Sequence, residues 1–211
     1  LLSWKLAPAL AAGCTVIAKP ATETPLAVRE LFISIDKAGL PDGVTNLIYG
    51  HGSTVGRTLV QHQDIRKVAF TGQTDTGKKI TQDASTNVKE MTLELGGHCP
   101  MIVDSEAKIE KAVKAGVYRS FRNMGQICNS INRIYVQEDV YEDFVEKFVE
   151  RTKELKIANG LEEPEADLGP MLNESGIEKT KRHIKDAVEK GAKAEYGAER
   201  PQGKEYEDGN F

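Results

Sequence analysis

The sequence predicts an α/β protein built on parallel strands. In its first half, short apolar runs alternate with helical patterns in the order strand, helix, strand, helix, strand. The first of these runs is continuously apolar, which is typical of a strand buried on both faces of a parallel sheet. This order predicts right-handed crossovers and a ligand at the carboxyl ends of the strands.

The first elements can be placed from local signals. Residues 3–12 are rich in alanine and leucine and contain Pro8, so a helix here must kink or begin near that proline. Residues 15–18 are predicted to form the first strand. The next helix is predicted to start with Thr24 as its N-cap and to end at Gly39.

The remaining elements follow the same periodicities. In the first half of the chain, strands are predicted at 45–49, 66–71 and 90–95, and helices at 53–61 and 75–84. An apolar run at 101–103 opens a second unit, for which we predict a strand at 132–136 and helices at 107–120, 140–157 and 177–190. We therefore place a domain boundary near Gly97.

Composition narrows the function classes. Of the 211 residues, 39% are hydrophobic and 28% charged, and no apolar run approaches the roughly 20 residues that span a bilayer. A net charge of -4 provides no basic field, so nucleic-acid binding is disfavoured. The three cysteines lack CxxC spacing, which argues against a zinc site or a disulfide framework and favours the cytoplasm. The chain lacks a signal-peptide pattern and an initiator methionine, so we expect an internal piece of a longer protein.

Cys128 is the main candidate for chemistry. It follows a Gly-Gln turn between a helical pattern and a strand-like segment, where side chains are easily presented to a cleft. The alternative is that Cys128 is a small buried hydrophobe, the commonest role of a lone cysteine.

Glu94 is a carboxylate flanked by leucines at the end of a predicted strand. A buried carboxylate is either paired or functional, and apolar surroundings would raise its pKa toward that of a general base. The alternative is that Glu94 points outward from an edge of the sheet.

Two strand-to-helix turns and one lysine are candidates for binding a nucleotide. The glycine-rich segment 50–56 is close to a dinucleotide fingerprint, but its third glycine comes one position late, and a tight turn explains it equally well. The turn at 70–74 precedes a helix whose amides could bind a pyrophosphate. Lys19 follows the first strand and could reach the same edge, although a loop lysine usually serves only solubility.

Taken together, these residues resemble the aldehyde dehydrogenase superfamily over essentially the whole chain. The matching segments, in order, contain Lys5, residues 15–20, 70–72, 93–97 and 125–128, followed by 167–171 and 190–193. The resemblance implies a Rossmann-like parallel sheet with helices on both faces in residues 1–97, a partial dinucleotide-binding domain. Residues 98–211 would begin a second α/β domain, the catalytic domain that carries the nucleophilic cysteine.

The resemblance also implies a reaction. Cys128 would add to an aldehyde, and the resulting thiohemiacetal would lose hydride to a nicotinamide and leave a thioester. Glu94 would activate the water that cleaves this thioester, and the Cys128 amide would help hold the oxyanion. Sulfur and carboxylate are therefore expected to meet across a cleft. The 121–123 segment is similar to the semialdehyde branch, which includes succinate-semialdehyde dehydrogenases.

The implied cofactor is NADP or NAD. The expected cofactor-binding residues are Lys19, Thr22, Gly52, Gly72, Gln73 and Leu95. The family often has a glutamate at the position of Thr22, and that carboxylate would repel a 2′-phosphate, so we hypothesise that NADP is accepted and preferred unless Glu23 enters the site. Gln73 stands where a serine commonly binds the pyrophosphate, and His98 and Cys99 replace a common Lys-Ser pair, with Cys99 taken as structural.

Other readings stay open. A non-catalytic nucleotide-binding module or a decayed relative would share the fold, but neither needs both Cys128 and Glu94. The family's oxyanion asparagine and second glutamate are absent from the chain, so we expect the full-length protein, as a homo-oligomer acting on a small aldehyde, to be active and the isolated chain inactive. No metal is expected.

Overall fold

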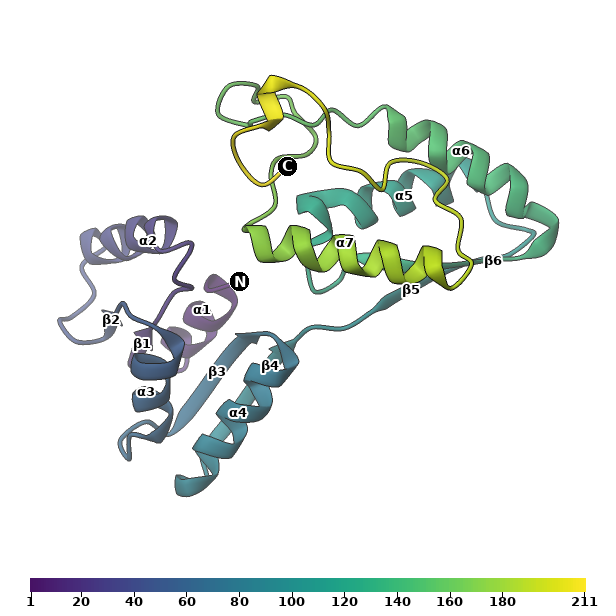
Figure 1. Ribbon diagram of the computed structural model, residues 1–211. Helices are drawn as coiled ribbons and strands as arrows, with labels where there is room; N and C mark the ends of the chain where they lie inside the picture. The colour runs from purple at the N-terminus through teal and green to yellow at the C-terminus, as the bar shows by residue number, and fades with distance from the viewer. The chain divides into compact units, whose positions relative to one another are not determined.

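The computed structural model describes residues 1–211 and divides them into two units, Leu1–Gly96 and Gly97–Phe211 (Figure 1). Each unit contains parallel strands connected through helices, so the predicted α/β class with parallel strands is confirmed. None of the helices is both long and apolar enough to cross a bilayer.

The first unit contains two separate strand pairs. Its helices are α1 (Ser3–Ala11), α2 (Leu26–Lys37), α3 (Arg57–Gln61) and α4 (Thr74–Ala84), and its strands are β1 (Val16–Ala18), β2 (Thr45–Leu47), β3 (Lys67–Gly72) and β4 (Glu90–Leu95). Hydrogen bonds join β1 to β2 and β3 to β4, both in parallel, and the two pairs are not joined to each other. The single sheet expected from the alternation is thus present as two pairs.

Two local predictions in this unit can be compared with the structure. The helix α1 starts at Ser3 and contains Pro8 in its interior, so of the two alternatives a start near the proline is excluded. The N-cap of α2 is Pro25, without a side-chain hydrogen bond, because Thr24 is used in a turn in which its amide donates to Ala21 O at 3.3 Å.

The second unit contains one strand pair and three helices. Its elements are β5 (Cys99–Val103), α5 (Ile109–Phe121), β6 (Ile131–Val136), α6 (Tyr141–Lys153) and α7 (Glu174–Glu189). The helix α7 has a true N-cap, since the Asn173 side chain accepts from the Gly176 amide at 3.1 Å. The predicted helix 140–157 ends early, because Ile157 instead forms a bridge with Leu168.

The core of the second unit lies between the strand pair and helices α5 and α6. Its fully buried members are Val103, Val113, Val117 and Phe144. Close approach of α5 and α6 depends on Gly116, where an added Cβ would lie 3.0 Å from the Phe148 ring. This packing fixes the α5 end that leads into the Cys128 segment.

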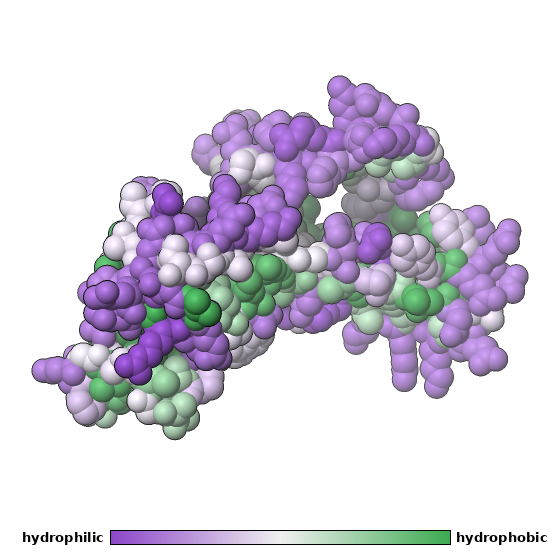
Figure 2. Space-filling model, turned by 90° about the horizontal axis from the view of Figure 1, so that it is seen from below, coloured by the Kyte–Doolittle hydropathy of each residue, from purple (hydrophilic) through white to green (hydrophobic).

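One face of the β5–β6 pair packs on this core and the other is open. Met101 and Ile134 pack against the core, whereas the register partners Ile102 and Tyr135 are 80% and 54% exposed. On the face of the molecule drawn in Figure 2, hydrophobic residues, in green, lie among hydrophilic ones, in purple.

Candidate functional site

Cys128 lies in a β-turn that joins α5 to β6. The turn is closed by the Ser130 amide, which donates to Ile127 O at 3.1 Å, and Cys128 is its second residue. The Cys128 side chain is exposed, so it is not a buried packing residue. Because the amide of the second residue of such a turn is not used in closing it, the Cys128 N–H remains available to a ligand.

The backbone before Cys128 is strained. Asn123, Met124 and Gly125 adopt φ angles of 53°, 56° and 71°, and the first two are unusual for residues with a side chain. Strain of this kind persists only where the surroundings hold it, and it clusters at functional sites.

Gln126 holds this strained segment in place. Its side-chain amide donates to Asn123 O at 3.1 Å, and the Asn123 side chain donates to Gln126 O at 3.2 Å. Its side-chain oxygen accepts from the Leu172 amide at 3.1 Å. Gln126 thereby ties the Cys128 turn to the segment before α7, a role that the sequence motif did not reveal.

Two further residues beside Cys128 were not expected to be relevant. The Cys99 thiol at the start of β5 donates to the main-chain oxygen of Cys128 at 3.8 Å. Ser130 is 5% exposed, and its hydroxyl has no hydrogen-bond partner. The Cys99 contact depends on how β5 and β6 align, so local sequence signals could not have shown it.

Glu94 lies on the exposed face of β4. The strand alternates, with Met91, Leu93 and Leu95 half-buried and Glu94 exposed, so the apolar burial considered from the sequence is absent. Its register partner on β3 is Thr71, whose hydroxyl accepts a hydrogen bond from Lys5 Nζ at 2.6 Å. Lys5 therefore brings a positive charge to the strand next to Glu94.

Lys19 is not a free surface lysine. Its ammonium donates to Pro20 O at 2.8 Å and to Gly50 O at 3.3 Å, so it links the loops that follow β1 and β2. Its aliphatic chain passes Gly56, where an added Cβ would lie 3.7 Å from Lys19 Cε. A cation is thus fixed at the carboxyl end of this strand pair.

The glycines near Lys19 have different roles. Gly50 has φ 144°, and an added Cβ would lie 2.4 Å from Val55 Cγ2, so a side chain is excluded there. Gly52 opens a short π-helical turn (Gly52–Gly56), and nothing lies within 4 Å of its missing Cβ. The backbone around Gly52 is therefore open.

The turn from β3 into α4 presents uncapped amides. Gly72 ends β3, and an added Cβ would lie 2.4 Å from the Phe70 ring. Gln73 is the N-cap of α4 and makes no capping hydrogen bond, so the first-turn amides remain available to an anion. Leu95 packs toward α4, because a Cβ on Gly77 would meet it at 2.6 Å.

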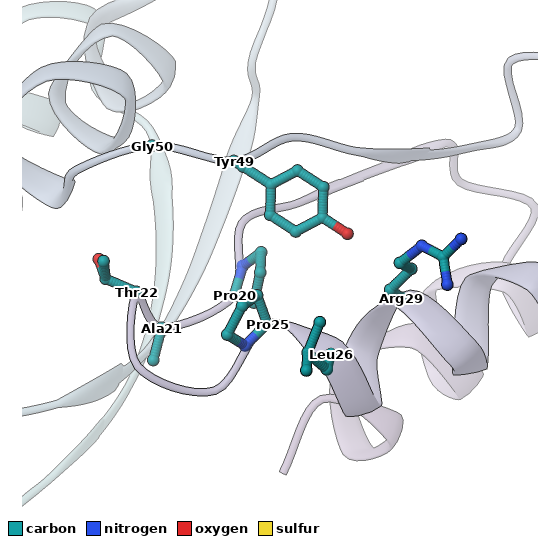
Figure 3. Close-up of a pocket in the computed structure, with 8 residues that line it drawn as sticks. All are labelled: Pro20, Ala21, Thr22, Pro25, Leu26, Arg29, Tyr49 and Gly50. Carbon is teal, nitrogen blue, oxygen red and sulfur yellow. The ribbon is translucent and has the colours of Figure 1, made fainter.

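A pocket of about 360 Å³ lies at the carboxyl ends of β1 and β2 (Figure 3). Its walls are mostly apolar, and Thr22 and Arg29 lie at opposite ends, with Tyr49 above Pro20. The lining residues are Pro20, Ala21, Thr22, Pro25, Leu26, Arg29, Tyr49 and Gly50. Of the predicted residues, Thr22 lines this cavity, and Lys19 donates hydrogen bonds to two of its lining residues. Glu94 belongs to the first unit and Cys128 to the second.

Comparison with known proteins gives a family match over the full chain. The model of the aldehyde dehydrogenase family matches residues 1–211. A protein of Sinorhizobium fredii named as a probable NADP(+) succinate-semialdehyde dehydrogenase is 44% identical over 201 residues, which are 95% of this chain and 41% of that protein. The betaine aldehyde dehydrogenase of Bacillus subtilis is 40% identical over 209 residues, 99% of this chain and 42% of that protein.

Solved structures have the same fold as this chain. The betaine aldehyde dehydrogenase of Staphylococcus aureus in complex with NAD+ superposes with a TM-score of 0.95 at 36% identity, covering 100% of this chain and 41% of that chain. A structure described as an NADP dependent enzyme of Escherichia coli gives 0.95 at 38% identity, covering 100% of this chain and 43% of that chain. The chain spans about two fifths of the length of these relatives.

Proposed function

The chain belongs to the aldehyde dehydrogenase family, and on this premise we propose that the intact protein oxidises an aldehyde to its carboxylic acid with NAD or NADP. The observation that carries the proposal is the exposed thiol of Cys128, held on a strained turn with its own amide free. A binding module needs no such thiol. The name of the Sinorhizobium fredii relative supports a semialdehyde as substrate.

We assign Cys128 the role of nucleophile. Its thiolate forms a bond to the aldehyde carbon, and the free amide of the turn donates to the oxygen that becomes negative. After hydride loss, the acyl group stays on the sulfur as a thioester. Glu94 then takes a proton from the water that attacks this thioester, which releases the acid and restores the thiolate. An exposed Glu94 is accessible to that water.

The first unit carries groups that suit a dinucleotide. Lys19 offers a fixed ammonium beside a mostly apolar pocket, and the uncapped amides after Gln73 offer an anion site at the start of α4. The bound cofactor would supply the hydride acceptor. We assign Lys19 and Thr22 to its adenosine end, Gly72 and Gln73 to its phosphates, and Gly52 and Leu95 to backbone contacts.

The proposal is tested in the intact protein by following aldehyde-dependent NAD(P)H formation. Cys128→Ala is expected to lower kcat by more than about 10³-fold, and Glu94→Gln by about 10²- to 10⁴-fold. A Cys128→Ala protein that keeps more than a tenth of the activity would overturn the assignment. The isolated chain of 211 residues is expected to bind cofactor but not to turn over.

A further inference from the structure

We propose that Cys99 is a resolving thiol, which captures Cys128 as a disulfide after a hydroperoxide has oxidised it. The proposal concerns a modification site within the second unit. It rests on the proposed function only in taking Cys128 as a reactive thiol, and its main readout does not need enzyme activity.

The contact between the two cysteines carries the proposal. Cys99 Sγ lies 3.8 Å from the main-chain oxygen of Cys128, although the residues are 29 positions apart. The two bonds from that oxygen to the Cys128 Cα add at most about 2.8 Å, which places this Cα within about 6.6 Å of the Cys99 sulfur. Disulfides require Cα atoms about 4.4–6.8 Å apart, so forming the bond requires the Cys128 turn and the start of β5 to move toward each other.

Both cysteines lie where the chain can make that movement. Cys128 is in a turn rather than in a strand, and Cys99 is the first residue of β5, at a register irregularity between Cys99 and Pro100. Gly96 and Gly97 come just before Cys99, and nothing lies within 4 Å of their missing Cβ atoms. Neither sulfur is held inside a rigid, closely packed core.

The exposures of the two thiols suit a division of roles. Cys128 is exposed and meets a dissolved oxidant first, whereas Cys99 is only partly exposed and already faces the Cys128 backbone. The third cysteine, Cys14, belongs to the other unit and is exposed. Cys14 therefore serves as a matched control.

The chemistry balances with hydrogen peroxide as the oxidant. The Cys128 thiolate attacks one peroxide oxygen, an S–O bond forms as the O–O bond breaks, hydroxide leaves, and a sulfenic acid remains. The Cys99 sulfur then attacks the Cys128 sulfur. The S–S bond forms as the S–O bond breaks, and the hydroxyl leaves as water with the thiol proton. A dithiol reverses the step by thiol–disulfide exchange.

The test treats the intact protein with hydrogen peroxide and maps its peptides without reduction. The expected product is a Cys99–Cys128 cross-linked pair, lighter by two hydrogens than the two thiol peptides and absent after dithiothreitol. Oxidation of Cys128 to sulfinic or sulfonic acid with no such pair would overturn the proposal.

A second readout uses variants. After peroxide, dithiothreitol is expected to restore most activity to the unmodified protein and to Cys14→Ser, but only a small fraction to Cys99→Ser, whose Cys128 proceeds to irreversible acids. Equal recovery in Cys99→Ser would contradict the role of Cys99. If the cross-link forms in a protein that oxidises no aldehyde, the proposed function fails and this inference stands. If the protein oxidises aldehyde and forms no cross-link, the proposed function stands and this inference fails.

Discussion

Replacing Thr22 by glutamate should turn the cofactor preference of the intact protein from NADP toward NAD. Thr22 lines the pocket beside Lys19, the cation that we assign to the adenosine end of the cofactor. A carboxylate at this position would repel a 2′-phosphate but could accept hydrogen bonds from the ribose hydroxyls of NAD. The unmodified protein is expected to prefer NADP.

The size of the effect follows from distance and exposure. Two like charges about 4 Å apart repel by about 1 kcal/mol in water and about 4 kcal/mol at an effective dielectric of 20. Because Thr22 is exposed, the lower part of this range applies. A penalty of about 1–2 kcal/mol lowers kcat/KM for NADP relative to NAD by roughly 5- to 30-fold.

The assay compares kcat/KM for both cofactors in Thr22→Glu and in Thr22→Gln. The glutamine variant has the same shape without the charge, so it should shift the ratio by no more than about 2-fold. A Thr22→Glu protein with an unchanged NADP/NAD ratio would refute the charge argument. The same ratio in both variants would show that shape decides the preference.

Three other changes test contacts inside the units, two in the second unit and one in the first. Gln126→Ala removes hydrogen bonds to Asn123 and to the Leu172 amide. We expect the free energy of unfolding in urea to fall by about 1–2 kcal/mol and kcat to be reduced. An unchanged kcat would show that other contacts hold the Cys128 turn. Phe144→Ala opens a cavity at a side chain that is 3% exposed and should cost about 3–5 kcal/mol, measured by the urea midpoint; a loss below about 1 kcal/mol would contradict its core position. Gly50→Ala would place a Cβ 2.4 Å from Val55 at φ 144° and should cost about 1–3 kcal/mol, whereas Gly52→Ala, which meets nothing, is its matched control.

The predictable part of the fold is the part encoded locally. Apolar runs and helical periods showed every strand and the main helices, because burial of one side of an element leaves a pattern in its own sequence. Helix ends were less accurate. The sequence predicted a helix through residue 157, but Ile157 pairs with Leu168, a partner eleven positions away that no helical period reveals. The sequence also predicted one sheet in the first unit, whereas the structure has two separate strand pairs. Which strands pair depends on residues far apart in the chain, and a local pattern does not show it.

The sequence predicted which residues belong to the candidate site, but not the contacts and exposure of their side chains. The helix-to-strand junction made Cys128 a candidate, and the resemblance to the aldehyde dehydrogenase superfamily gave it the role of nucleophile. The structure adds its strained backbone and the support from Gln126. The sequence predicted a structural role for Cys99. Its contact with Cys128 arises only when β5 and β6 pair, so no local pattern could reveal it. The expected burial of Glu94 was one of two alternatives, and alternation along β4 places it on the exposed face.

The central claim is that Cys128 carries the acyl group during turnover. It is tested most directly by mixing the intact Glu94→Gln protein with aldehyde and cofactor, quenching in acid, and locating the added mass by peptide mapping. The account predicts an acyl adduct on the peptide that contains Cys128 and on no other. Turnover with no adduct there, or an adduct on Cys14 or Cys99 instead, would contradict it.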